Sequence, residues 1–309
     1  MADYDQWLDD EVKAYLARCD ALYPPDAINL DIPGQRRVYD DMCAAFDRGR
    51  PASVSVTDQD YGGVSCRRYE PEAESNGTIV YYHGGGFVVG GLDSHDSICA
   101  EMCENSGVRL VAVDYPLAPE HRYPEDFDAA WDAYVAIRDA FAGPIVVAGD
   151  SAGGNLAAAV SHKGRQEGKL PDGQLLIYPG LGGDMSLPSY SEHAFAPQLT
   201  RADIEFYMSI RFGSDRPDPD PHFAPLSARS FAGLPPTICI TAECDPLTSD
   251  SDEYVNRILA AGGQALWINE AGLVHGYLRA RGMSKRAADS FRRICSGLRS
   301  LTVGQWPPI

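Results

Sequence analysis

The sequence predicts an α/β fold, in which helices flank a mostly parallel central sheet. Strand-like and helix-like runs alternate over most of the 309 residues, a length sufficient for one large domain with an insertion. Several strand-like runs are apolar almost throughout, as expected for strands buried on both faces of a sheet. Two earlier runs rich in β-branched residues are separated by Gly62 and Gly63, which favours a hairpin before the alternation begins.

The chain begins with an amphipathic pattern over residues 3–19, where Leu8, Val12, Leu16 and Cys19 share one stripe. A second helix is predicted at 38–46, and the hairpin strands at 53–61 and 64–71. Further strands are predicted at 78–82, 109–115, 145–149, 174–179, 237–243 and 264–271. Helices are predicted near 95–106, 125–140, 152–167, 248–261 and 283–300.

The alternation stops once, between about residues 180 and 230. Residues 199–212 have a helical pattern, whereas the stretch "DRPDPDPHFAP" at 215–225 contains too much proline for a helix interior. We interpret this segment as an insertion that covers the carboxyl edge of the sheet, where α/β folds place their sites. The expected organisation is N-terminal cap helices at 1–50, core at 51–180, cap insertion at 181–230 and core at 231–309.

Composition and charge exclude some partners. The formal net charge of −18 argues against nucleic acid and against anionic membrane surfaces as partners. No basic, apolar leader or membrane-length run is present, so a cytoplasmic location is expected. The eight cysteines are predicted to be reduced thiols. His95, Cys99 and Cys103 have a four-residue spacing, but we interpret them as core residues and expect no metal or other cofactor.

The stretch "GDSAGG" at 149–154 joins a predicted strand to a predicted helix. Gly149 and Gly153 flank Ser151 in the pattern G-x-S-x-G, which is typical of a tight turn that exposes a nucleophilic serine. A plain Gly/Ser loop is the alternative for so short a motif.

A nucleophilic serine needs a base and an orienting carboxylate, which in this kind of sheet follow it in the order acid, then histidine. His275 follows the last predicted strand, whereas His193 and His222 lie in the insertion. Asp245 directly follows the preceding strand, with Glu243 and Asp250 as rivals. Position favours the trio Ser151, Asp245 and His275.

The stretch "YYHGGGFVVGG" at 81–91 places three glycines directly after a strand. Such a loop lets backbone N–H groups point into a cavity, where two of them and the N–H of Ala152 could bind an oxyanion. No phosphate-loop spacing fits these glycines. The combination predicts a hydrolase site.

Six motifs together resemble the bacterial hormone-sensitive-lipase-like esterases, and acetyl esterases most of all. They are "HGGGF" (83–87), "DYPLAPEHRYP" (114–124), "GDSAGG" (149–154), "DPHFAPL" (220–226), "ECDPL" (243–247) and "VHGY" (274–277). The resemblance implies an α/β-hydrolase fold with a small helical cap. It also implies Ser151 as nucleophile, His275 as base and Asp245 as its orienter. The oxyanion donors would be Gly84, Gly85 and Ala152, with Gly86 left open and His83 as a brace.

One position departs from the family pattern, because Pro116 stands where the family usually has an arginine that would pair with an acid. The resemblance otherwise predicts a serine carboxylesterase that acts on small esters and forms a homodimer. A cap this small would leave a confined, apolar acyl pocket, which predicts a preference for short acyl chains. Amidase or formamidase chemistry by the same three residues and a non-catalytic binding protein are the alternatives.

Overall fold

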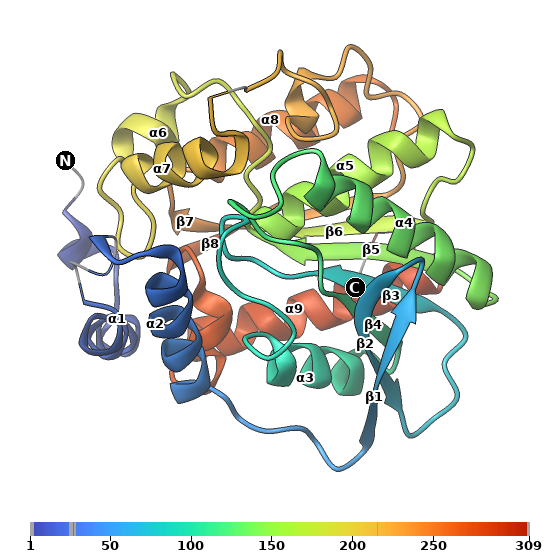
Figure 1. Ribbon diagram of the computed structural model, residues 1–309, viewed down its shortest axis with the longest axis horizontal. Helices are drawn as coiled ribbons and strands as arrows, with labels where there is room; N and C mark the ends of the chain where they lie inside the picture. Colours follow the sequence, from blue (N-terminus) through green and yellow to red (C-terminus); the bar gives the residue numbers. More distant parts are fainter. Residues whose placement is uncertain (1–2, 25–26, 28, 215, 308–309) are drawn as a thin grey trace.

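The computed structural model describes residues 3–24, 27, 29–214 and 216–307, so Asp215 of the proline-rich stretch lies outside the described residues. Within them, one eight-stranded sheet has the order β1-β2-β4-β3-β5-β6-β7-β8 (Figure 1). Its strands are β1 (Val54–Tyr61), β2 (Val64–Pro71), β3 (Thr78–Tyr82), β4 (Arg109–Val113), β5 (Ile145–Asp150), β6 (Gly173–Ile177), β7 (Thr237–Cys244) and β8 (Ala265–Val274).

The predicted hairpin forms, with Tyr61 opposite Val64 across the two glycines. Strand β2 pairs antiparallel with both β1 and β4, and the remaining neighbours in the sheet are parallel. The central strands β3, β5 and β6 are buried along their whole length, which explains their continuous apolar runs. The predicted α/β class is confirmed.

Helices cover both faces of the sheet (Figure 1). One face carries α3 (Asp96–Ser106) and α9 (Lys285–Thr302), whose apolar side chains join a core cluster that includes Ile98 and Leu298. The other face carries α4 (Glu125–Ala140), α5 (Ala152–Gln166) and α8 (Thr248–Ala260), which contribute to a second cluster through residues such as Tyr134, Leu156 and Ile258. Two cores on opposite faces hold the sheet rigid between them.

Four helices from two distant parts of the chain gather at one end of the sheet (Figure 1). They are α1 (Asp10–Leu22) and α2 (Ile32–Ala45) from the N-terminal segment and α6 (Pro188–Glu192) and α7 (Arg201–Phe212) from the insertion. Short 3₁₀ helices are η1 (Tyr4–Gln6), η3 (Pro225–Ser227) and η4 (Tyr277–Gly282).

The two N-terminal helices differ from their predicted bounds because of their caps. Asp9 accepts a hydrogen bond from the N–H of Val12, so α1 begins at residue 10 rather than 3. Asp31 does the same for Gly34, so α2 begins six residues before the predicted position. The sequence analysis overlooked α6, which has only five residues and no apolar period.

The insertion is attached to the core by a buried ion pair. Arg211 at the end of α7 donates to Asp126 of α4 at 2.7 Å, and both side chains are almost fully buried. The Arg211 guanidinium also lies 3.5 Å from the centroid of the Phe87 ring, which follows the glycine loop. No helix in the described part of the chain has the length and apolarity needed to span a membrane.

Candidate active site

Ser151 occupies the sharp turn between β5 and α5. Its backbone has φ 53° and ψ −117°, a conformation that non-glycine residues rarely adopt. A Cβ on Gly149 would collide with the backbone of Gly153, and a Cβ on Gly153 would collide with the carbonyl of Tyr82. The two flanking glycines are therefore required by the close approach of strand and helix, and the G-x-S-x-G stretch forms the predicted turn rather than a plain loop.

Asp245 follows β7 and His275 follows β8, two paired strands that β6 separates from β5. The His275 Nε2 lies 2.9 Å from the Ser151 Oγ, and the His275 Nδ1 lies 2.7 Å from the Asp245 Oδ2. The N–H of Leu247 donates to the other oxygen of Asp245 at 2.8 Å, and the Asp245 carboxylate is fully buried. The structure thus brings together the three residues that the sequence singled out.

The rival carboxylates have other contacts. Glu243 accepts a hydrogen bond from the N–H of Gly272 at 2.8 Å. Asp250 accepts hydrogen bonds from the N–H groups of Leu181 and Gly183, at 2.8 and 3.2 Å, and so fixes the start of the insertion. Neither carboxylate contacts His275 among the interactions of the described residues.

The rival histidines also lie in other surroundings. The Nδ1 of His193 is 3.2 Å from the hydroxyl of Tyr4, and His193 packs edge-on against Trp7. The ring of His222 stacks on Phe127 with centroids 4.8 Å apart. Both histidines help to join the insertion to other parts of the chain.

The glycine loop corrects one expected oxyanion donor. The N–H of Gly84 donates to Asp150 Oδ1 at 2.9 Å, so it is occupied and cannot also face the pocket. Gly85 and Gly86 have φ values of 128° and 61°, and they line the same pocket as Ser151 and Ala152. No described acceptor bonds to their N–H groups. Ala152 begins α5, so its N–H has no intrahelical partner either.

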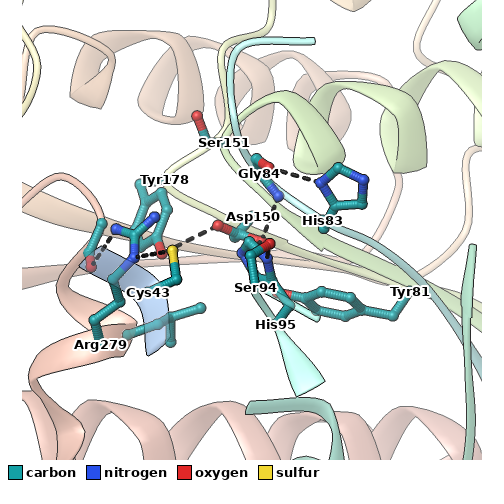
Figure 2. A network of polar contacts seen from close by, with 12 residues as sticks. Cys43, Tyr81, His83, Gly84, Ser94, His95, Asp150, Ser151, Tyr178 and Arg279 are labelled. Carbon is teal, nitrogen blue, oxygen red and sulfur yellow. Dashed lines mark hydrogen bonds and ion pairs between the residues drawn. The ribbon is translucent and has the colours of Figure 1, made fainter. Parts of the chain in front are cut away.

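Asp150 holds this arrangement from beneath, as Figure 2 shows. Its carboxylate accepts hydrogen bonds from Tyr81, at 2.7 Å, and from Tyr178, at 3.3 Å, besides the one from Gly84. The His95 Nε2 lies 3.3 Å from it. Burial alone would raise the pKa of Asp150, but the charge of His95, hydrogen bonds from His95 and Tyr81 and the charge of Arg279 lower it well below its usual value, so the group stays charged. Sequence reasoning missed this role, although Asp150 is part of "GDSAGG".

His83 braces the glycine loop, as the resemblance implied. Its Nδ1 lies 2.7 Å from the carbonyl oxygen of Gly84, and its ring stacks on Tyr115 with centroids 4.3 Å apart. Burial, with a contribution from the charge of His95, lowers the pKa of His83 to about 4. The neutral ring therefore donates to the Gly84 carbonyl and fixes the orientation of that peptide.

The loop that contains Pro116 is held by an arginine from elsewhere in the chain. Arg36 of α2 pairs with Glu120 at 2.7 Å and donates to the carbonyls of Val88 and Ala118, at 2.8 and 3.0 Å. It therefore links α2 to the glycine loop and to the loop that follows β4.

The site opens into a cavity of about 800 Å³. Ser151 and His275 form part of its wall, together with residues of α1, α2 and α7. The apolar residues of α7 that line it are Ile204, Phe206, Tyr207, Met208 and Phe212. Tyr207 lies so close to Gly86 that a Cβ on this glycine would be 2.6 Å from the ring.

The His95, Cys99 and Cys103 spacing does not form a metal site in the described part of the chain, where no group of three potential ligands is arranged around a common point. His95 faces Asp150, and both cysteines are fully buried in the core. Burial raises the pKa of Cys103 to about 12, as expected for a thiol packed among apolar side chains.

Comparisons with known proteins agree with this geometry. The family described as alpha/beta hydrolase fold matches residues 79–279. Esterase LipI of Mycobacterium tuberculosis is 38% identical over 256 residues, which cover 79% of this chain and 80% of that protein. The chain belongs to the α/β-hydrolase esterases. Membership of this family makes it an ester hydrolase and confirms the resemblance to the hormone-sensitive-lipase-like enzymes.

Two further α/β-hydrolase relatives support the assignment. Carboxylesterase NlhH of Mycobacterium tuberculosis is 39% identical over 232 residues, 72% of each chain. A solved structure of the ester-hydrolase EH1AB1 from the metagenome of Lake Arreo, in complex with a bipyridine phosphonate derivative, has a TM-score of 0.88. It is 30% identical and covers 96% of this chain and 100% of that chain. The match therefore includes the cap helices as well as the sheet.

Proposed function

We propose that this α/β-hydrolase is a serine carboxylesterase that hydrolyses small esters with short acyl chains. The observation that carries the proposal is the continuous hydrogen-bonded line from Ser151 through His275 to Asp245, which lies at the wall of a cavity of about 800 Å³. A serine hydroxyl is a weak nucleophile at neutral pH, and a histidine at 2.9 Å supplies the base that it needs.

The reaction follows from the positions of these atoms. His275 accepts the proton of Ser151 as its Oγ attacks the ester carbonyl carbon, and Asp245 stabilises the resulting imidazolium. The carbonyl oxygen becomes an oxyanion, which the N–H groups of Gly85, Gly86 and Ala152 bind. The tetrahedral intermediate then expels the alcohol, to which His275 returns the proton. Water attacks the acyl-serine with the same base, which releases the acid and restores Ser151.

The cap helices that line the cavity support the preference for short acyl chains. An apolar pocket gains about 0.8 kcal/mol per buried CH₂ until its wall is reached, after which further methylenes clash. Helices α1, α2 and α7 contribute to the wall of this cavity, and Tyr207 lies against the glycine loop. We expect a preference for acyl chains of roughly two to six carbons, with a steep decline beyond about eight.

A series of p-nitrophenyl esters from acetate to palmitate, assayed with the wild type and Ser151→Ala, tests the proposal. The wild type should have its highest kcat/KM on short chains, and Ser151→Ala should lose at least about a thousandfold in kcat while keeping its circular-dichroism spectrum. An activated phosphonate should label Ser151 in the wild type only.

Three results would contradict the proposal. Near-wild-type turnover in folded Ser151→Ala would remove the nucleophile, and a maximum on palmitate would indicate a lipase. Faster cleavage of matched p-nitroanilides than of the esters would indicate an amidase that uses the same three residues.

A further inference from the structure

Arg279 is a charged side chain in the pocket wall that the ester-hydrolysis steps do not use. It lies on η4, one turn after His275, and its guanidinium is beside Tyr178 and Cys43 in Figure 2. The Arg279 side chain is partly buried, and its remaining exposed surface lines the same cavity as Ser151. Because arginine is charged at every accessible pH, this places a fixed positive charge at the site.

The partners of this guanidinium are neutral. Its nitrogens donate to the Tyr39 hydroxyl, to the Cys43 Sγ at 3.4 Å and to the Gly276 carbonyl at 3.5 Å. Arg279 forms no ion pair with any carboxylate of the described residues. Three neutral partners leave part of the five-donor fork unused.

The nearest buried acid does not neutralise it directly. Asp150 feels the charge of Arg279, but its oxygens already bind Tyr81, Gly84 and Tyr178 and face His95. Arg211 in the same cavity wall is different, since it is paired with Asp126 at 2.7 Å. Burying a charge without a directly paired counter-ion is unfavourable. A neutral side chain could tie η4 to α2 without that cost, so a purely structural role does not explain a cation here.

We infer that Arg279 binds a carboxylate of the substrate, so that the preferred esters carry a free carboxylate on the acyl or the alcohol part, as half-esters of dicarboxylic acids do. This inference rests on the proposed esterase function. The planar fork of arginine matches the two oxygens of a carboxylate and holds them with charge-assisted hydrogen bonds. The carboxylate would replace the missing counter-ion.

The location fits a group attached to the bound ester. An Arg279 Nη lies 2.8 Å from where a Cβ of Gly276 would be, and Gly276 directly follows His275. A short chain extending from an ester carbonyl at Ser151 therefore approaches this side of the cavity. The apolar side of α7 remains available for the other part of the ester.

Matched pairs of substrates test the inference in two arms, one with the carboxylate on the acyl part of the ester and one with it on the alcohol part. Monoethyl glutarate is compared with ethyl pentanoate for the acyl arm, and 4-acetoxybutanoate with pentyl acetate for the alcohol arm, with hydrolysis followed by titration of the released acid. The wild type should prefer the charged member of one pair. Arg279→Gln should lower the ratio of charged to neutral kcat/KM in that pair by at least tenfold. Arg279→Lys, which keeps the charge but loses the fork, should give an intermediate ratio.

Arg216→Gln is the matched control, because Arg216 is an exposed arginine of the same cavity that lies over Phe212. It should leave the charged-to-neutral ratio within about twofold of the wild-type ratio. An equal fall in both glutamine variants, or a wild type that prefers the neutral ester in both arms, would overturn the inference.

Binding to Ser151→Ala separates this inference from the esterase proposal. Calorimetry on Ser151→Ala should detect binding of monoethyl glutarate but not of ethyl pentanoate. The double variant that also carries Arg279→Gln should show no heat of binding with monoethyl glutarate. This readout needs no turnover, so a wild type that hydrolyses none of the esters contradicts the proposed function alone. Absence of binding by folded Ser151→Ala contradicts the carboxylate site. If Arg279→Gln does not fold, competition between monoethyl glutarate and ethyl pentanoate for the wild type decides the same question.

Discussion

At the scale of single residues, the role of each carboxylate depends on which of its oxygens already accept a hydrogen bond from another group. Asp245 has one oxygen on Leu247 and the other on His275, whereas Glu243 holds Gly272 and Asp250 holds the insertion. Chain order and strand position predicted Asp245 correctly as the partner of His275. Its catalytic role stays a prediction.

Asp245→Asn should therefore lower kcat on the order of ten-thousandfold, since the imidazole loses its orientation and its charge partner. Glu243→Gln is the matched control, because the glutamine oxygen can still accept from Gly272, and it should change kcat by less than about tenfold. Steady-state kinetics on one p-nitrophenyl ester compares the two variants. A larger loss in Glu243→Gln would assign the wrong carboxylate.

Residue types alone could not predict which glycine N–H groups face the pocket. Three consecutive glycines look equivalent in the sequence, and only the backbone angles decide the direction of each peptide. The hydrogen bond from Gly84 to Asp150 shifts the available donors by one residue, to Gly85 and Gly86. Arg36 likewise pairs with Glu120, which lies more than eighty residues later in the chain, a contact that no local pattern could reveal.

At the scale of elements, the strands and core helices were predicted from their periodicity, because burial on both faces of a sheet leaves a strong pattern. The cap helices were less well predicted. Their starts depend on Asp9 and Asp31 as caps, and α6 is held by tertiary contacts. The Tyr190 hydroxyl in α6 donates to Asp250 at 3.1 Å.

Asp250 makes the attachment of the insertion sensitive to pH. Burial raises the pKa of Asp250 to about 6, although two backbone N–H groups and Tyr190 oppose the shift. Because the pKa of Asp250 is higher in the folded than in the unfolded state, its contribution to the free energy of unfolding is fully present at pH values below 3.8, the ordinary pKa of the group. That contribution is lost as the pH rises through about 6. The loss should reach about 3 kcal/mol.

Asp250→Asn should abolish this part of the pH dependence, because the amide stays neutral and its oxygen can still accept from Leu181 and Gly183. Urea unfolding at pH 4.5, 6 and 7.5 measures the free energy of unfolding of both proteins. The variant should gain on the wild type as the pH rises, whereas Asp252→Asn on the same helix should not. A variant that is less stable than the wild type by the same amount at every pH would contradict this account.

At the scale of the whole molecule, two segments that are more than a hundred residues apart contribute to the wall of the cavity. Helices α1 and α2 pack against the core through Val12, Tyr15 and Met42, and α7 adds the opposite wall. Residues 1–50 and 181–230 are therefore proposed to act as one cap. The expected homodimer and the cytoplasmic location stay predictions.

Removal of residues 1–22 should open the cavity, because α1 supplies Cys19 and borders the site next to Tyr23. We expect lower activity on acetate, a weaker decline toward longer acyl chains and a lower melting temperature. The p-nitrophenyl ester series and a thermal melt measure these effects. An unchanged chain-length profile in the folded truncated protein would mean that α1 does not limit the acyl pocket.

The order of the elements along the chain has a consequence for biosynthesis. Helices α1 and α2 leave the ribosome before any strand of the sheet, yet Tyr15 donates its hydroxyl to the carbonyl of Gly276, more than 250 residues later. Strand β8, which positions His275, can pair with β7 only after almost the whole chain has been translated. Until β8 and η4 have been synthesised, the apolar faces of α1 and α2 therefore stay uncovered, and a chaperone could bind them there. A nascent chain stalled before residue 275 holds the serine but not the base, and it should be inert toward esters.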